Sequence, residues 1–188
     1  MLPLGVRFFQ LRINDLAGEA LAAEIRAARD LAARHGAVMV VNDHWRAAIA
    51  EGCGFVHLGQ EDLAAADLPA IREAGLRLGV STHDHGELET ALAAGPDYVA
   101  LGPVYPTKLK AMPWAPQGLG RIAEWKARIG AMPLVAIGGF RPDRAGPAFA
   151  AGADVVSVVT DITLNPDPEA RVRDWIAATR APEMEDRP

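Results

Sequence analysis

The sequence Phe55-Val-His-Leu-Gly-Gln-Glu-Asp62 decides the fold class of this chain. Its first half is an apolar run that is too short for a helix and is typical of a buried strand. Its second half turns polar and leads into Ala64 to Ala74, an alanine-rich segment with helical spacing. A strand that passes through a polar turn into a helix is the repeating unit of a parallel sheet with helical crossovers. This stretch therefore predicts an α/β fold.

The same unit recurs along the chain. Further short apolar runs predict strands at Val6 to Leu11, Ala37 to Val41, Arg77 to Val80, Tyr98 to Leu101, Leu134 to Ile137 and Val155 to Val159. Helical spacing predicts helices between or after them at Ala17 to His35, Glu87 to Ala94, Gly120 to Ile129, Pro142 to Ala151 and Pro168 to Thr179. Every predicted strand ends in polar or glycine-rich residues. This favours a barrel over an open doubly wound sheet, because a barrel brings all the carboxyl ends to one mouth.

We therefore predict a (β/α)8 TIM barrel that forms one domain over residues 1–180, with a loose polar tail at 181–188. A complete barrel needs eight strands, whereas the sequence supplies about seven. Met1-Leu-Pro-Leu-Gly5 resembles the end of a helix and directly precedes the first predicted strand. The first βα unit is thus expected to be missing. An unpaired barrel edge favours aggregation, which indicates a late start codon or a truncated chain.

The composition excludes several classes of protein. The chain has 188 residues, 50% of them hydrophobic, with Lys+Arg 19, Asp+Glu 24 and a formal net charge of -5. Without a Lys/Arg cluster, this balance argues against nucleic-acid or membrane-surface partners and leaves small anionic ligands. The single cysteine, Cys53, excludes an intramolecular disulfide. The sequence has no apolar run of about 20 residues and no signal peptide, so we expect a cytoplasmic protein.

Carboxylates follow two successive predicted strands. Asn42-Asp43 comes after one strand and Asp62 after the next. Two carboxylates with neighbouring amide and backbone oxygens suit Mg²⁺, which keeps waters and shares its other positions with substrate phosphates. The alternative is that Asp43 and Asp62 are helix N-caps, since both precede helical segments. Neither role excludes the other.

Two turns in the last third of the chain indicate a phosphate site. Gly138-Gly139 and Val158-Val-Thr160 follow the last two predicted strands. In TIM barrels the loops after strands seven and eight commonly bind a phosphate through backbone N–H groups. The alternative is a tight turn in which glycine supplies a positive φ.

The connection from Gly102 to Gly118 is the longest in the chain and carries Lys108 and Lys110. Loops of this length are uncommon unless they are functional, so we expect a substrate-covering loop. With Arg12 opposite, its lysines would supply positive charge for a diphosphate. The alternative is a solvated surface loop. His57 is interpreted as a hydrogen-bonded core residue, and His83 and His85 are as consistent with solvent-facing positions as with ligands.

Together these motifs resemble those of thiamine phosphate synthases. The ordered series consists of Gln10-Leu-Arg12, Val41-Asn-Asp43, Val56-His-Leu-Gly-Gln-Glu-Asp62, Gly79-Val-Ser-Thr-His83, Gly102-Pro-Val-Tyr-Pro-Thr107 with Lys110, and Val135-Ala-Ile-Gly-Gly139. The resemblance implies a (β/α)8 barrel and an Mg²⁺-dependent transferase. Its small-molecule substrates would be 4-amino-2-methyl-5-hydroxymethylpyrimidine diphosphate and a thiazole phosphate, joined with release of pyrophosphate in thiamine biosynthesis.

The resemblance also implies roles for individual residues. Asp43 and Asp62 would bind Mg²⁺. Arg12, Ser81 and Lys110 would be the catalytic residues. The substrate-binding set would be Gln10 at the pyrimidine, Arg12, Asn42, Ser81 and Lys110 at the diphosphate or its metal, Thr107 at the thiazole, and the backbone of Gly139, Val159 and Thr160 at the thiazole phosphate.

The sequence departs from the family pattern at two positions. Asn14 stands where the family usually has Lys, and Leu109 stands where it usually has Thr. Lys108 is a hypothetical substitute for the missing cation. Two rival functions are a thiazole tautomerase with His83 as acid and base, and a non-catalytic phosphate-binding barrel. The retained diphosphate and metal residues argue against the tautomerase. The sequence is compatible with a homo-oligomer and with a monomer.

Overall fold

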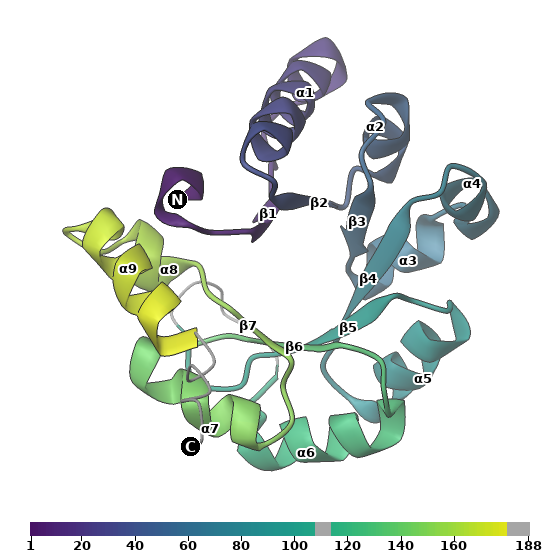
Figure 1. Cartoon of the computed structure of the whole chain (residues 1–188). Helices are drawn as coiled ribbons and strands as arrows, with labels where there is room; N and C mark the ends of the chain where they lie inside the picture. Colours follow the sequence, from purple (N-terminus) through teal and green to yellow (C-terminus); the bar gives the residue numbers. More distant parts are fainter. Residues whose placement is uncertain (108–113, 180–188) are drawn as a thin grey trace, which may run out of the picture.

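The computed structural model describes residues 1–107 and 114–179. Its centre is a curled parallel sheet of seven strands that follow one another in sequence order (Figure 1). The strands are β1 (Phe8–Leu11), β2 (Val38–Asn42), β3 (Phe55–Leu58), β4 (Arg77–Thr82), β5 (Tyr98–Leu101), β6 (Leu134–Ile137) and β7 (Val155–Ser157). The predicted count of seven strands is confirmed, and β1 and β7 form the two edges of the sheet.

Helices surround the outer face of the sheet (Figure 1). They are η1 (Leu2–Leu4), α1 (Gly18–Arg34), α2 (Trp45–Ala50), α3 (Gln60–Ala65), α4 (Leu68–Glu73), α5 (His85–Ala93), α6 (Gly118–Ile129), η2 (Pro142–Arg144), α7 (Ala145–Ala150), α8 (Thr160–Thr163) and α9 (Pro168–Thr179). The short helix η1 packs against α9. The N-terminal segment therefore lies beside the last helix, between the two edge strands.

Two apolar clusters stabilise this arrangement because each strand alternates its side chains between two faces. The larger cluster fills the layer between the sheet and the helices and includes Ile25, Leu58, Val80, Leu101 and Trp125. The smaller cluster lies inside the curl of the sheet. It consists of Val40, Phe55, Tyr98, Ala100 and Val135. The polar residues that follow the strands lie above this inner cluster, at the carboxyl ends.

The predicted strands are confirmed: three of the seven match at both ends, and the other four differ by one or two residues at one or both ends. The single helix predicted over Ala64 to Ala74 is wrong, because the chain forms α3 and α4 with a break between them. Asp67 causes the new start: its side chain caps α4 by accepting a hydrogen bond from the Ala70 N–H at 3.0 Å. The short helices α2 and α8 were not predicted. The predicted tail at 181–188 lies outside the described residues.

Candidate active site at the mouth of the sheet

The candidate residues follow the carboxyl ends of the strands, as a parallel sheet requires. Gln10 lies on β1, Asn42 ends β2 and Ser81 lies on β4. Gly139 comes after β6, and Val159 and Thr160 come after β7 at the start of α8. Because all seven strands are parallel, these residues are brought to one edge of the sheet.

Asp43 has an unusual backbone conformation. Its φ is 63°, and it is the one described residue other than glycine with a positive φ. Its N–H donates to the His57 carbonyl at 2.9 Å, and the Asn42 side-chain amide donates to its carboxylate. Positive φ in a residue with a side chain costs conformational energy and is concentrated at functional sites. This conformation marks Asp43 as a candidate functional residue.

The N-cap interpretation of the two aspartates is wrong. The N-cap of α2 is His44, and no side chain caps that helix end. Asp62 lies inside the first turn of α3, whose N-cap is Gly59. Both carboxylates therefore have no capping role in the helices that follow their strands.

The electrostatics of Asp43 show which charges surround it. Burial raises the pKa of Asp43, and the negative charge of Asp62 raises this pKa further. The positive charge of Arg12 acts in the opposite direction. Asp43, Asp62 and Arg12 thus lie close enough for their charges to interact. Two carboxylates and a cationic side chain are the kinds of group that a divalent cation and an anionic ligand require.

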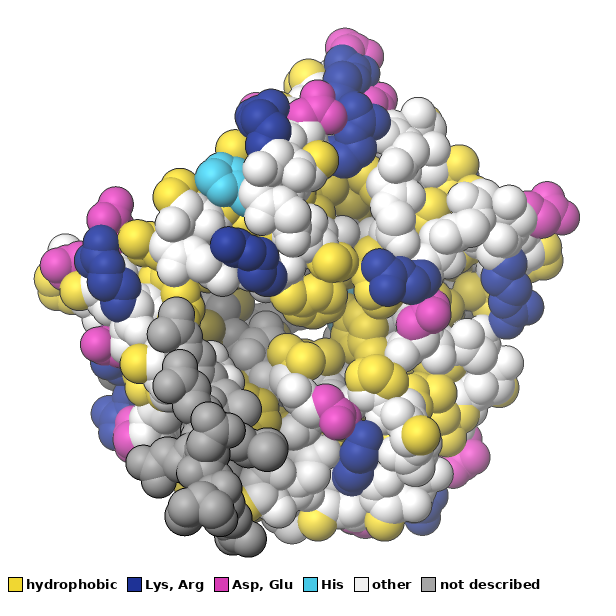
Figure 2. Space-filling model, viewed as in Figure 1, with side chains coloured by type: hydrophobic (Ala, Val, Ile, Leu, Met, Phe, Trp, Pro, Cys, Tyr) yellow, Lys and Arg dark blue, Asp and Glu magenta, His cyan; other side chains and the backbone are white. Residues whose placement is uncertain are grey.

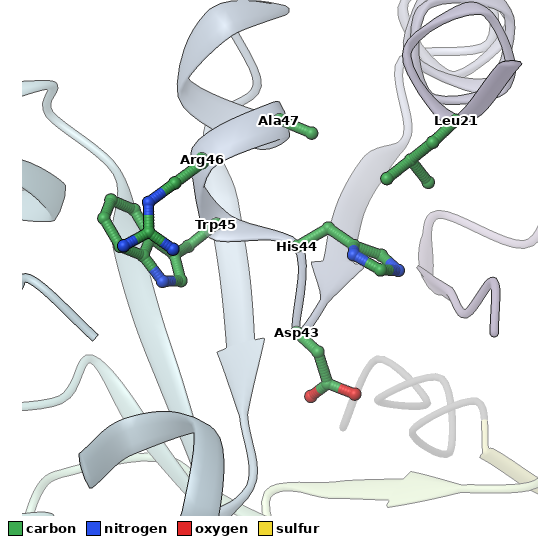
Figure 3. Close-up of a pocket in the computed structure, with 6 residues that line it drawn as sticks. All are labelled: Leu21, Asp43, His44, Trp45, Arg46 and Ala47. Atoms are coloured by element: carbon green, nitrogen blue, oxygen red, sulfur yellow. The ribbon is translucent and has the colours of Figure 1, made fainter. Parts of the chain in front are cut away.

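A hollow of about 230 Å³ lies next to Asp43 (Figure 3). It is lined by Leu21, Asp43, His44, Trp45, Arg46 and Ala47. The His44 ring is fixed by a hydrogen-bond contact of 2.8 Å between its Nε2 and the Ile13 carbonyl. The Arg46 guanidinium stacks 4.1 Å from the centre of the Trp45 ring and points away from Asp43 (Figure 3).

Ser81 is held from two sides. Its hydroxyl lies 2.7 Å from Nε2 of His57, and its carbonyl accepts a hydrogen bond of 2.6 Å from the Gln60 side chain. The other ring nitrogen of His57 lies 2.7 Å from the Tyr98 hydroxyl. The interpretation of His57 as a hydrogen-bonded core residue is confirmed, and it also contacts a candidate site residue.

The glycine pair after β6 is required by packing as well as by conformation. Gly138 and Gly139 have φ values of 101° and 68°. A Cβ atom on Gly139 would lie 2.5 Å from the Pro106 carbonyl oxygen, and one on Gly138 would lie 2.7 Å from Pro103. The tight-turn interpretation is therefore confirmed. The bare backbone of this turn packs against the segment that follows β5.

Helix α8 is anchored to α9 by hydrogen bonds of the Asp161 side chain. Asp161 accepts hydrogen bonds from Nε and Nη2 of Arg171 at 2.7 and 3.0 Å, and from the Trp175 indole at 2.8 Å. These contacts lower the pKa of Asp161, although its burial acts in the opposite direction. They tie Val159 and Thr160 to α9.

Comparison with known proteins identifies the family. A family model described as thiamine monophosphate synthase matches residues 1–162. A thiamine-phosphate synthase from Rhizobium etli is 62% identical over 179 residues, which cover 95% of this chain and 88% of the relative. One from Citrobacter koseri is 49% identical, with 95% and 82% covered. The chain belongs to the thiamine monophosphate synthase family.

A solved structure supports the fold of this family member. The thiamine phosphate pyrophosphorylase from Pyrococcus furiosus superimposes with a TM-score of 0.82 at 24% identity, over 94% of this chain and 84% of that one. A 3-hexulose-6-phosphate synthase gives 0.68 at 18% identity, over 94% and 92%. Both likenesses show a shared TIM-like fold. Among the described residues, no helix has the length and apolar character needed to span a membrane.

Part of the predicted site of this synthase-family chain lies outside the described residues. Lys108, Leu109 and Lys110 fall in the segment 108–113. Thr107 is the last described residue before that segment. On the far side of it, Trp114 stacks on His83 with ring centres 3.8 Å apart, and the Gln117 side chain donates to the His83 carbonyl at 2.9 Å.

His83 is therefore not a solvent-facing residue. Its Nδ1 contacts the Glu87 carboxylate at 2.6 Å, and Trp114 covers its ring. His85 pairs with Glu124 on the outside of the sheet. The sequence reasoning missed Gln60, which bonds the candidate residue Ser81, and Tyr98, which bonds His57. Tyr98 was counted only as part of a strand, and no local pattern distinguishes an inward tyrosine from an outward one.

On the face seen in Figure 2, Lys, Arg, Asp and Glu side chains are interspersed, and hydrophobic side chains gather around the centre. Charges that are mixed in this way do not form an extended basic surface.

Proposed function

We propose that this chain is an active thiamine-phosphate synthase that uses Mg²⁺. It would join 4-amino-2-methyl-5-hydroxymethylpyrimidine diphosphate to a thiazole phosphate and release pyrophosphate. The observation that carries this proposal is the juxtaposition of Asp43, Asp62 and Arg12 at the mouth of a family member's sheet. Both substrates are phosphates, and we place their conversion in the cytoplasm.

The reaction breaks one bond and forms one. The bond between the pyrimidine methylene carbon and the diphosphate oxygen breaks, and the diphosphate takes the electron pair. The electron-rich aminopyrimidine stabilises the resulting cation. The lone pair of the thiazole nitrogen then forms the new C–N bond. Such a reaction depends on neutralising the leaving group and excluding water more than on a general base.

The donor set suits magnesium. Within residues 1–107 and 114–179, no group of three or more His, Cys, Asp or Glu side chains is arranged to hold a metal ion. Two carboxylates fit Mg²⁺, which completes its octahedral shell with waters and substrate phosphates. Asp43 and Asp62 would hold the ion, which when bound supplies positive charge to the leaving diphosphate. Arg12 adds a cation that does not depend on the metal.

The other proposed roles come from the resemblance to the family motifs. Arg12, Ser81 and Lys110 would be catalytic contacts of the diphosphate, with Asn42 beside them. Gln10 would contact the pyrimidine and Thr107 the thiazole. The backbone N–H groups of Gly139, Val159 and Thr160 would bind the thiazole phosphate.

Two features of the site favour the synthase over the thiazole tautomerase. A tautomerase would need the His83 ring to act on substrate, whereas this ring is paired with Glu87 and covered by Trp114. A tautomerase also has no use for the two carboxylates. A non-catalytic barrel would keep binding and lose turnover, which the assay below distinguishes.

The test is product formation from the two substrates by the purified chain. We expect thiamine phosphate with Mg²⁺ and none with EDTA. Asp62→Asn should lose most of the activity, whereas Asp30→Asn, which alters an exposed carboxylate on α1, should keep it. A folded sample that binds pyrophosphate without forming product would contradict the proposal.

A further inference from the structure

Three hydrogen-bonded side chains connect the interior of the sheet to its mouth. The Tyr98 hydroxyl lies 2.7 Å from Nδ1 of His57, and Nε2 of His57 lies 2.7 Å from the Ser81 hydroxyl. The strand register aligns His57 with Gly79 and Gly79 with Tyr98, and Ser81 is two residues nearer the mouth. We call Tyr98, His57 and Ser81 the interior relay.

The charge state of His57 limits how the relay is bonded. His57 is only 6% exposed, and in the described part of the chain its ring nitrogens contact two hydroxyl groups and no carboxylate. The ring is therefore neutral at pH 7. A neutral imidazole has one N–H donor and one acceptor nitrogen, so one neighbour must donate to it and the other must accept from it.

Tyr98 decides between the two arrangements. If Nδ1 carried the hydrogen, the Tyr98 hydroxyl would accept it and would need another acceptor for its own hydrogen. In the described part of the chain, His57 is the side chain that the structure gives as partner of this hydroxyl. Buried polar hydrogens are nearly always bonded. Tyr98 therefore donates to Nδ1, and Nε2–H of His57 donates to Ser81.

We propose that Tyr98 and His57 are positioning residues that turn the hydroxyl hydrogen of Ser81 toward an anionic oxygen of the diphosphate substrate. This inference rests on the proposed function, in which Ser81 contacts that diphosphate. An ionised diphosphate oxygen only accepts hydrogen bonds, so Ser81 must donate to it. In the opposite arrangement the Ser81 hydroxyl would donate its hydrogen bond to Nε2 of His57 and would have no hydrogen left for the substrate. The bond from His57 also polarises the hydroxyl, because linked hydrogen bonds strengthen one another.

Gln60 supports the same arrangement from the backbone. Its side-chain amide donates to the carbonyl oxygens of Ser81 at 2.6 Å and Glu87 at 3.3 Å. These bonds fix the end of β4 relative to α5. The serine hydroxyl is thus held by the relay, while its main chain is held by Gln60.

The tautomer of His57 can be read without substrate. Long-range ¹H–¹⁵N correlation spectra of the wild-type chain should place the ring hydrogen on Nε2, with the signal assigned from its loss in His57→Gln. In Tyr98→Phe the hydrogen should move partly or wholly to Nδ1. A wild-type ring protonated on Nδ1 would overturn the proposal.

A double-mutant cycle tests whether Tyr98 acts through Ser81. With Mg²⁺ present, calorimetry with pyrophosphate should show an affinity about two- to tenfold weaker for Tyr98→Phe, as the loss of one hydrogen bond predicts. The same substitution should have no effect in a Ser81→Ala background. Losses of affinity that simply add would show that Tyr98 affects binding independently of Ser81, and the positioning role would be wrong.

Thr82→Val is the control for stability. It deletes a buried hydroxyl on the other face of β4, where Thr82 accepts from the Trp125 indole at 2.8 Å. This variant should unfold more easily yet keep its pyrophosphate affinity. If the wild-type chain bound no pyrophosphate, the proposed function and the role of Ser81 would fail together. If it bound pyrophosphate but the cycle were additive, the positioning role alone would fail.

Discussion

Gly79 and Tyr98 face each other on neighbouring strands, and a Cβ atom on Gly79 would lie 2.1 Å from Cζ of the tyrosine ring. The register pairs the two residues directly. The ring therefore occupies the space that a side chain at position 79 would fill. This packing lets the Tyr98 hydroxyl reach past β4 to His57 on β3.

Gly79→Ala should destabilise the chain. The added methyl group overlaps the Tyr98 ring, and overpacking of this kind costs about 1 to 3 kcal/mol. Urea unfolding measures the loss, and pyrophosphate calorimetry should show weaker binding because the relay is displaced. Gly120→Ala is the matched control: nothing lies within 4 Å of its added Cβ, and in the first turn of α6 alanine should be neutral or stabilising, by at most about 1 kcal/mol. Equal stability of Gly79→Ala and wild type would contradict this account.

The parts of the fold that the sequence predicted are those with local causes. Strand β3 and the polar turn after it are defined by an apolar run and a glycine, and the predicted position was correct. The break between α3 and α4 was missed because Asp67 looks like any polar residue until its capping bond is seen. The relay was missed because His57, Ser81 and Tyr98 meet only through strand register, which no single stretch of sequence encodes.

His57 should make stability depend on pH. Its pKa is 6.5 in an ordinary environment and about 4 here, with burial as the main cause. As the pH falls below 6.5 the unfolded chain takes up this proton and the folded chain does not, so stability is lost until the folded ring also titrates. The full loss is about 3 kcal/mol.

Urea unfolding between pH 4 and 7 measures this loss. The profile of His57→Gln should be flatter than that of the wild type, although the variant is less stable overall. Parallel profiles for the two chains would show that His57 does not carry the effect.

Asp43→Asn should stabilise the metal-free chain at neutral pH. Burial and the charge of Asp62 raise the pKa of Asp43, so its ionised form is unfavourable in the folded state. Asparagine removes that cost and tolerates the φ of 63°. The gain in Tm should shrink as the pH falls toward the raised pKa, where the wild-type carboxyl takes up a proton.

Magnesium should reverse the order of stability of the wild type and Asp43→Asn. Mg²⁺ should raise the Tm of the wild type and have little effect on Asp43→Asn, whose Mg²⁺ affinity should be at least about tenfold lower. Scanning calorimetry with and without Mg²⁺ measures both quantities. An equal response of the two chains to Mg²⁺ would argue against Asp43 as a ligand.

Asp161→Asn should weaken the connection between α8 and α9. The carboxylate bonds Arg171 and Trp175, and hydrogen bonds to a charged group contribute about 1.5 to 3 kcal/mol. Because the pKa of Asp161 is lowered on folding, its contribution is present above the ordinary pKa and is lost as the pH falls through the lowered one. The KM for the thiazole phosphate should rise, since Thr160 is adjacent.

Asp174→Asn is the control for this change. Asp174 contacts the same Arg171 at 3.3 Å, but its side chain is 59% exposed. An exposed ion pair contributes at most about 1 kcal/mol, so this variant should keep both its stability and its KM. Similar losses in the two variants would show that burial of Asp161 is unimportant.

Asn14→Lys should increase the rate of the synthase reaction. Asn14 is exposed and lies two residues after Arg12, where the family pattern usually has a lysine. A cation there adds a charge-assisted hydrogen bond to the leaving diphosphate, about 1.5 to 3 kcal/mol or about ten- to a hundredfold in rate if it acts in the transition state. Ala17→Lys adds the same charge at another exposed position and should leave kcat unchanged. An unchanged rate in Asn14→Lys, together with a large loss in Lys108→Ala, would instead assign the missing cation to Lys108.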